Sequence, residues 1–258
     1  MKPALSEKHT AVPSDWAQFA QGPELATDIS KLLEPWWQKI FGYYLLKVGD
    51  LSCQLDTAQC KTTHQINLGL DTETVNLRAE PDALPVREHS VDAVLLAQCL
   101  EYSSDPHHVV REAHRVLMPD GYLLLTGFNP FSLMGVLGSL PWLKQRYPWS
   151  GRFFSASRVK DWLHLVGFEV VSEQRFFCSN MLARETRRGA LSLWSERYLN
   201  YFGACYLLVA RKRELPLTPI RPRWRLNTEF NPAVKGVSAR QSIRQISEYS
   251  CRDKSDKS

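Results

Sequence analysis

A single glycine stands at a predicted strand–helix junction in the stretch "YYLLKVGDLSCQLDTAQC", which begins at Tyr43. The apolar start of this stretch predicts a strand, Gly49 a sharp turn, and the residues after it a helix. Enzymes that bind nucleotide cofactors often carry several glycines at this junction, because the backbone approaches the ligand closely there. Here Gly49 is followed by Asp50, Leu51 and two further non-glycine residues. The stretch is therefore a cofactor loop with reduced glycine content, or a turn that never held a cofactor.

Other side chains capable of chemistry give weaker signals. The adjacent His107 and His108 point in different directions at a predicted helix start, so they make a poor metal pair. Tyr102 is a candidate general base or pocket wall, and buried tyrosine is commonly structural. The six cysteines include no CxxC pair and are widely scattered, unlike a zinc site or a disulfide framework. The sequence therefore predicts no metal site and assigns no catalytic residue.

The composition is that of an ordinary soluble globular protein, with 258 residues of which 44% are hydrophobic and 23% charged. The N-terminal stretch "MKPALSEKHTAVPSDW" is polar and lacks the apolar core of a signal peptide. No apolar run approaches the roughly 20 residues that span a bilayer. We therefore expect a cytoplasmic protein with reduced thiols and no membrane span.

The positive charge is concentrated toward the C-terminal end. The net charge is +5, and residues 211–258 carry twelve Lys or Arg against five Asp or Glu. A basic tail can contact nucleic acid or anionic lipid by charge alone. The basic residues are dispersed, however, and they do not alternate with aromatic residues as in platforms that stack nucleic-acid bases. The favoured interpretation is a solvated, largely disordered extension, and nucleic-acid binding is not expected.

Short apolar runs alternate with helical patterns through the middle of the chain. Strands are predicted at residues 43–48, 64–70, 75–79, 93–97, 122–127, 168–177 and 204–212. The clearest helix is capped by Asp105, begins at Pro106 and ends at the turn "PDG" over residues 119–121. A further helix stops at Gly167. Apolar strands covered by helices are typical of a doubly wound, mainly parallel α/β sheet.

The same patterns predict the domain organisation. Residues 24–40 form an apolar helical stripe that Pro35 interrupts, so one kinked helix and two abutting helices both stay open. The stretch at residues 190–202 is also predicted to be helical, and residues 129–154 are read as an insertion over the strand ends. Three parts are expected: an N-terminal helical extension over residues 1–42, a main domain over residues 43–213, and the basic tail over residues 214–258.

The stretch "DALPVREHSVDAVLLAQCLEYSSDPHHVVREAHRVLMPDGYLLLTGFNP" resembles class I S-adenosylmethionine-dependent methyltransferases of the small-molecule type. Ordered family motifs are matched by Leu84, Pro85, Ser90, Asp92, Val94, Leu100, Glu101, Asp105, Pro106, Glu112, Arg115, Val116, Leu117, Pro119 and Gly121. The later stretch "FSASRVKDWLHLVGFEVV" resembles another family segment, so the resemblance covers about residues 43–212. It implies a Rossmann-like sheet with an antiparallel last strand, and S-adenosylmethionine as the cofactor.

The resemblance also implies four contacts with the cofactor. The family pattern "LDLGCGTG" places Gly49 at its first glycine, while Leu51 and Cys53 stand at the second and third. A leucine at the second position narrows the loop or pushes it into another conformation. Asp71 matches an acidic residue after the second strand that accepts hydrogen bonds from the ribose hydroxyls, although aspartate is also common in turns. Asp82 matches a carboxylate near the adenine amino group. Gln98, directly after the fourth strand, is expected to lie along the cofactor.

Three functions stay open on these observations. The chain is an active methyltransferase for a small or lipid-like acceptor, a methyltransferase fold with impaired cofactor binding that serves as an interaction module, or a nucleic-acid-associated protein. Asp71 and Asp82 favour the first function, and the altered loop favours the second. Methyl transfer from a sulfonium depends on positioning and on excluding water, so the lack of an obvious catalytic residue does not argue against activity. We therefore predict a methyltransferase with a small-molecule acceptor.

Overall fold

The computed structural model describes residues 11–70, 75–138, 140, 142–176 and 203–214. The chain divides into two compact units, residues 1–215 and 216–258, and the second unit lies wholly outside the described residues. Three features predicted from the sequence also fall outside them: Asp71, the helix at residues 190–202, and nearly all of the basic tail.

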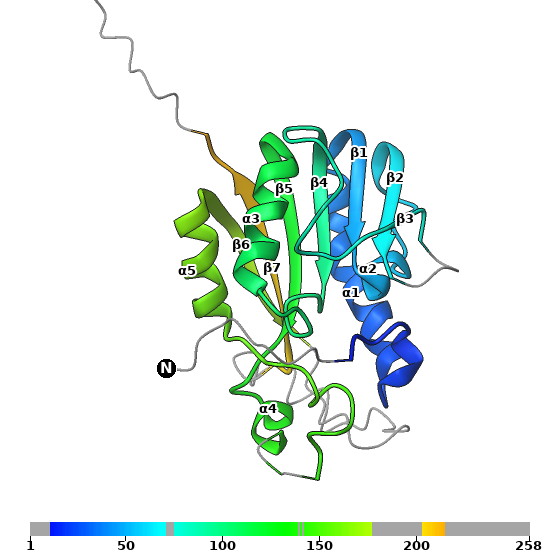
Figure 1. Cartoon of the computed structure of the whole chain (residues 1–258), viewed down its shortest axis with the longest axis vertical. Helices are drawn as coiled ribbons and strands as arrows, with labels where there is room; N and C mark the ends of the chain where they lie inside the picture. Colours follow the sequence, from blue (N-terminus) through cyan, green and yellow to red (C-terminus); the bar gives the residue numbers. More distant parts are fainter. Residues whose placement is uncertain (1–10, 71–74, 139, 141, 177–202, 215–258) are drawn as a thin grey trace, which may run out of the picture. The chain divides into compact units, whose positions relative to one another are not determined.

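A seven-stranded sheet forms the centre of the first unit, with the strand order β3-β2-β1-β4-β5-β7-β6 (Figure 1). Its strands are β1 (Phe41–Val48), β2 (Lys61–Gly69), β3 (Leu77–Arg78), β4 (Val91–Ala97), β5 (Leu117–Phe128), β6 (Phe168–Phe176) and β7 (Cys205–Lys212). Neighbouring strands from β3 to β5 pair in parallel, and β7 pairs antiparallel with both β5 and β6. The predicted mainly parallel α/β sheet with an antiparallel last strand is confirmed.

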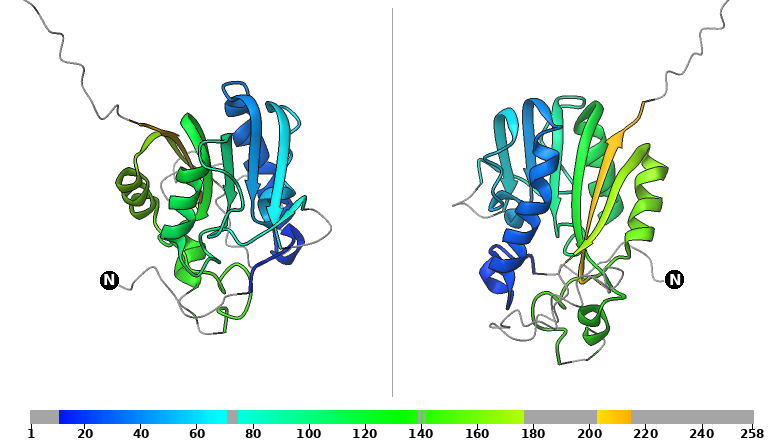
Figure 2. Two further views of the ribbon diagram at one scale, coloured as in Figure 1. Left: turned by 45° about the horizontal axis from the view of Figure 1, so that its top comes forward. Right: turned by 180° about the vertical axis from the view of Figure 1, so that it is seen from behind.

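Both faces of the sheet are buried, which explains the continuous apolar runs in the central strands. Successive side chains point to opposite faces, so Leu46 and Leu96 join the core on one face while Leu45 and Leu95 join the core on the other. Helices α3 (Pro106–Val116) and α5 (Ala156–Val166) cover the first face, and α1 (Gly22–Trp37) covers the second (Figure 2).

The helix boundaries follow local capping chemistry. Asp105 caps α3 by accepting the backbone N–H of His108, and Pro106 occupies the first helical position as predicted. Gly167 ends α5 in the left-handed conformation. Helix α1 is continuous through Pro35, so the alternative of one helix is the one observed. Among the described helices, none is both long and apolar enough to cross a bilayer.

The connection from β2 to β3 differs from that of a typical doubly wound fold, and the connection from α3 to β5 differs from the one predicted from the sequence. No helix lies among the described residues between β2 and β3, as the short spacing in the sequence predicts. The turn at residues 119–121 was expected to separate a helix from a strand, but α3 already ends at Val116 and β5 starts at Leu117. Asp120 takes a positive φ of 64°, so the turn forms an irregularity within the long β5 strand.

Candidate functional site

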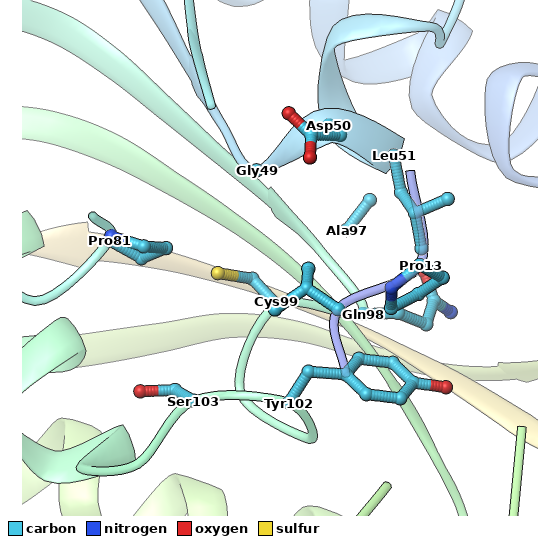
Figure 3. Close-up of a pocket in the computed structure, with 11 residues that line it drawn as sticks. Pro13, Gly49, Asp50, Leu51, Pro81, Ala97, Gln98, Cys99, Tyr102 and Ser103 are labelled. Atoms are coloured by element: carbon cyan, nitrogen blue, oxygen red, sulfur yellow. The ribbon is translucent and has the colours of Figure 1, made fainter. Parts of the chain in front are cut away.

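A pocket of about 390 Å³ lies at the carboxyl ends of β1 and β4 (Figure 3). It is lined by Val12, Pro13, Gly49, Asp50, Leu51, Pro81, Ala97, Gln98, Cys99, Tyr102 and Ser103. The chain runs outward from β1 to β2 and β3 on one side, and from β4 to β5 on the other. Doubly wound sheets bind their ligands at such a switch in strand order, because the loops diverge there and leave a crevice.

Gly49 forms the turn at the end of β1 and requires glycine because of its backbone conformation. Its φ of 89° and ψ of 145° lie in a region that side chains disfavour. A Cβ atom there would lie 3.6 Å from the Sγ of Cys99, which is an ordinary contact distance. The Gly49 N–H donates to the carbonyl of Leu68 at 2.7 Å, so the turn is tied to β2.

Ser52 and Asp50 fasten this turn to the neighbouring strands. The fully buried Ser52 hydroxyl donates to the Val48 carbonyl at 2.6 Å and accepts the Ala97 N–H at 2.7 Å, which joins the end of β1 to the end of β4. The Asp50 carboxylate accepts the N–H of Leu70 at 2.9 Å. Asp50 therefore positions the chain directly before Asp71, although Asp71 itself lies outside the described residues.

The helix after Gly49, α2 (Asp50–Cys53), is only four residues long. A helix this short has little macrodipole to offer a cofactor carboxylate at its amino end. Leu51 in α2 lines the pocket and is 3% exposed. Its carbonyl accepts the indole N–H of Trp16 at 3.0 Å, and nearby Val12 and Pro13 form part of the pocket wall. The N-terminal segment thus packs directly on the altered loop.

The end of β4 brings Gln98 and Cys99 to the pocket. Gln98 has a positive φ of 45°, and its side-chain carbonyl accepts the Thr126 hydroxyl at 2.9 Å. Its buried amide nitrogen has no hydrogen-bond partner among the described residues. Cys99 points toward Pro81 across the pocket (Figure 3). Burial is the main cause of a raised pKa for the Cys99 thiol, and repulsion from nearby carboxylates raises it further. The thiol is therefore neutral at physiological pH.

Glu101 and Tyr102 lie behind and beside the pocket. Burial raises the pKa of Glu101 to about 7, although one of its oxygens accepts the Phe128 N–H at 2.8 Å. Its other oxygen has no hydrogen-bond partner in the described structure. The Tyr102 hydroxyl donates to the Pro148 carbonyl at 3.3 Å, and burial raises its pKa well above the usual value. Tyr102 is therefore a neutral wall residue rather than a proton acceptor.

Two of the four residues that the resemblance assigns to the cofactor, Gly49 and Gln98, line the pocket together. Asp82 is half-buried beside the lining residue Pro81, and its charge contributes to the raised pKa of Cys99. Sequence reasoning missed Asp50, which occupies a non-glycine position of the loop pattern. Sequence reasoning also gave Glu101 no role, because its burial depends on contacts with the distant β5 strand.

Lys47 is a further residue that the sequence reasoning overlooked. The family pattern "LDLGCGTG" has aspartate at the position of Lys47, and this difference is visible in the sequence. Lys47 is 5% exposed, and its ammonium donates to the Leu55 carbonyl at 3.3 Å. Burial lowers the pKa of this amine. Lys47 lies on β1 just before the turn, so the strand leading into the pocket also departs from the family pattern.

The aromatic residues after β5 do not form one pocket wall. Phe131 and Trp142 are exposed, whereas Trp149 and Phe154 are buried in two different cores. Asn129 ends β5 as predicted for a turn, because its carboxamide accepts the Phe131 N–H and donates to the Gly203 carbonyl. Within the described ranges, no group of three or more His, Cys, Asp or Glu side chains is placed to hold a metal ion.

Comparison with known proteins identifies the family. Residues 42–125 match the family model described as "Methyltransferase domain". The chain is 37% identical over 218 residues to the uncharacterized protein YafS of Escherichia coli strain K12, a match that covers 84% of this chain and 88% of that protein. The chain belongs to the class I S-adenosylmethionine-dependent methyltransferase family. The resemblance found in the sequence is confirmed.

Solved structures show the same methyltransferase fold at lower identity. A methyltransferase of Thermotoga maritima is 18% identical with a TM-score of 0.51, over 73% of this chain and 92% of that one. One from Archaeoglobus fulgidus is 16% identical with a TM-score of 0.52, over 72% and 94%. The [4+2]-cyclase SpnF is 18% identical with a TM-score of 0.53, over 81% and 88%. Because one of these proteins is named a cyclase, likeness of fold does not identify the reaction.

The residues around the pocket fit S-adenosylmethionine, the cofactor of this methyltransferase family. The pocket lies at the switch in strand order, where doubly wound sheets bind their ligands. The unpartnered amide nitrogen of Gln98 is a buried donor at the pocket wall. The carboxylate of Asp50 at the same wall suits a ligand that carries positive charge.

Proposed function

We propose that this protein transfers the methyl group of S-adenosylmethionine to a small or lipid-like acceptor. The observation that carries this proposal is a pocket at the switch in strand order between β1 and β4, lined by Gly49, Asp50 and Gln98. Gly49, Asp71, Asp82 and Gln98 are the proposed cofactor contacts, with Asp71 at the ribose and Asp82 near the adenine. Asp50 is added because it lines the pocket and is 4% exposed.

The charge distribution favours a cationic ligand. Asp50 lines the pocket, and Asp50, Asp82 and Glu101 all lie close enough to Cys99 for their charges to raise the pKa of its thiol. When bound, S-adenosylmethionine supplies an electrophilic methyl group on a positively charged sulfonium. The demethylated product lacks that charge. The Asp50 carboxylate at the pocket wall therefore favours the substrate form of the cofactor over the product form.

The surrounding side chains orient the ligand and exclude water rather than transfer a proton. Leu51, Ala97 and Tyr102 form apolar walls, and Val12 and Pro13 add a cover from the N-terminal segment. The Tyr102 hydroxyl is kept neutral by burial, and the geometry assigns it no role as a base. Excluding water and aligning two reactants are the main requirements of an in-line displacement.

Isothermal titration calorimetry of the whole chain with S-adenosylmethionine and with its demethylated product tests this function. Asp50→Asn keeps an oxygen that can accept the Leu70 N–H but removes the charge. We expect the variant to bind the sulfonium form about tenfold more weakly while binding the product form nearly unchanged. Asp71→Ala should weaken both forms about tenfold, because the ribose is common to both. Wild-type protein that binds neither form at millimolar concentration would contradict the proposal.

A second candidate function rests on Leu51. Its side chain lies at the position of a family glycine, and its carbonyl is tied to Trp16 at 3.0 Å. A loop held in this way would serve as a structural turn in a methyltransferase fold that binds cofactor poorly and acts as an interaction module. The same calorimetry separates the two functions, since this alternative predicts no binding of either cofactor form.

A further inference from the structure

Five large apolar side chains are exposed on the segment that follows β5. We call Phe131, Leu133, Val136, Leu140 and Trp142 the α4 surface, after helix α4 (Leu133–Leu137) at its centre. Their exposed fractions are 72%, 65%, 62%, 37% and 65% respectively. Large apolar side chains gathered this closely on a surface mark a site of interaction with a partner or a membrane.

The same segment is firmly held to the body of the protein by its other side. Met134 and Leu143 are buried in the core beneath α1, and the Trp149 indole donates to the Met134 carbonyl at 2.8 Å. Ser132 caps α4 by accepting the N–H of Gly135. The segment is therefore fixed to the body by its inner side, while its outer side exposes apolar side chains.

The charge of this region has one sign only. Between Asp120 and Asp161 the sequence contains no acidic residue, whereas it contains Lys144, Arg146, Arg152, Arg158 and Lys160. Lys144 and Arg146 are exposed within four residues of Trp142. Exposed Trp, Phe and Leu beside Lys and Arg are the composition of segments that lie in the interface of an anionic bilayer.

The chain that follows the α4 surface contacts residues at and beside the pocket. The Tyr102 hydroxyl, at the pocket, donates to Pro148, and the Arg152 N–H donates to the Glu101 carbonyl at 2.8 Å. In Figures 1 and 2, α4 lies beyond the carboxyl ends of β4 and β5, the same edge of the sheet at which the pocket opens. A membrane at the α4 surface would therefore lie near the pocket entrance.

We propose that the α4 surface docks on an anionic phospholipid bilayer, with its apolar side chains in the interface and Lys144 and Arg146 at the lipid headgroups. A protein partner would have to combine an apolar contact with acidic groups placed opposite the exposed Lys144 and Arg146. An anionic membrane offers an apolar interior and negatively charged headgroups together. In combination with the proposed function, on which this consequence rests, the methyl acceptor is then an amphiphile drawn from the bilayer.

Sedimentation of the full-length protein with vesicles tests the docking without requiring catalysis. Vesicles of phosphatidylcholine are compared with vesicles that contain about one quarter phosphatidylglycerol, at low and high salt. We expect binding to the anionic vesicles that weakens as salt increases, because the charges are then screened. Phe131→Ser combined with Trp142→Ser should reduce the partition coefficient about tenfold.

Matched variants separate this surface from the rest of the molecule. Phe41→Ser combined with Tyr43→Ser changes side chains that are 75% and 70% exposed at the opposite end of β1, and it should leave vesicle binding unchanged. Lys144→Gln and Arg146→Gln should each reduce binding to anionic vesicles about fivefold. All of these side chains are exposed, so circular dichroism should show that each variant folds normally.

Three outcomes would overturn the docking proposal. Wild-type protein that binds neither kind of vesicle contradicts it directly. Binding that survives Phe131→Ser with Trp142→Ser would place the membrane contact elsewhere, for example on the basic tail. A dimer that the same variant dissociates, without vesicle binding, would assign the surface to a second copy of the chain. Vesicle binding without cofactor binding would leave the docking standing while the proposed function fails.

Discussion

The two strand ends that form the pocket keep their shape by different means. At the end of β1, side-chain hydrogen bonds hold the turn: Ser52, within the loop, bonds to both β1 and β4, and the distant Trp16 donates to the Leu51 carbonyl. At the end of β4, the backbone itself is unusual, with Gln98 at a positive φ of 45°. A buried carboxylate, Glu101, follows three residues later. Both ends contain a residue with positive φ, Gly49 after β1 and Gln98 after β4. The first turn is joined to two strands by Ser52, whereas the second is followed by a desolvated acid.

This difference shows that departure from a glycine-rich pattern does not by itself leave a loop poorly ordered. The end of β4 matches the family motifs, while the end of β1 matches only at Gly49. Nevertheless the residues after Gly49 are buried and joined to two strands. Substitutions at the two strand ends test how each of them is held, and they are given from the largest expected effect on stability to the smallest.

Leu51→Gly should destabilise the protein by about 3–5 kcal/mol, because it removes a buried side chain and places glycine in a helix. The sequence pattern alone predicts that this change strengthens cofactor binding, and the packing of Leu51 adds a cost in stability. Urea unfolding measures the change in stability, and calorimetry on the folded variant measures binding. Leu133→Ala, at a residue that is 65% exposed, is the control and should cost less than about 0.5 kcal/mol. A loss below about 1 kcal/mol for Leu51→Gly would show that its side chain contributes little to the core.

Glu101→Gln should change the pH dependence of stability. Burial raises the pKa of Glu101 from 4.5 to about 7 in the folded state. The stabilisation of the folded state by protonated Glu101 is therefore present in full below about pH 4.5 and is lost as pH rises through about 7. Between these two pH values the free energy of unfolding of the wild type should fall by about 3 kcal/mol relative to that of the variant, since each pKa unit corresponds to about 1.4 kcal/mol.

Urea unfolding of both proteins at several pH values between 4 and 8 measures this effect. Glu80→Gln, at an exposed position, serves as the control and should follow the wild type at every pH. A constant difference between Glu101→Gln and the wild type across this range would mean that Glu101 titrates normally.

Ser52→Ala should lower the free energy of unfolding by about 2 kcal/mol, because the buried N–H of Ala97 loses its hydrogen-bond acceptor. Chemical denaturation measures the loss. Ser104→Ala changes a half-buried serine whose hydroxyl has no hydrogen bond among the described residues. Its stability should stay within about 0.5 kcal/mol of the wild type. Equal effects of the two substitutions would mean that the bridge between β1 and β4 contributes nothing specific.

Trp16→Phe should have the smallest effect, about 1 kcal/mol, from loss of the hydrogen bond to the Leu51 carbonyl. Trp142→Phe is the matched control, since that indole is 65% exposed. Comparing the unfolding midpoints of the two variants isolates the contact between the N-terminal segment and the loop. A midpoint for Trp16→Phe at the wild-type value would show that this contact is dispensable.

Much of the fold could be predicted because its signals are local. Asp105 and Pro106 predict the start of α3, and Gly167 predicts the end of α5. The apolar strands around Leu46 and Leu95 predict a sheet covered on both faces. The start of β5 was placed too late, because the turn residues at 119–121 look like a boundary in the sequence but lie within a strand. Pairing with β4 at Leu117 overrides that local signal.

The sequence by itself determined the order of elements, the family and the place of Gly49, since these depend on periodicity and on motifs of nearby residues. Only the tertiary structure decided that Asp50 and Gln98 face one pocket, that Trp16 packs on the loop, and that Glu101 is desolvated. The physical reason is the distance along the chain. Burial and hydrogen bonding of these side chains depend on strands and segments far away in sequence, which no local pattern of residues specifies.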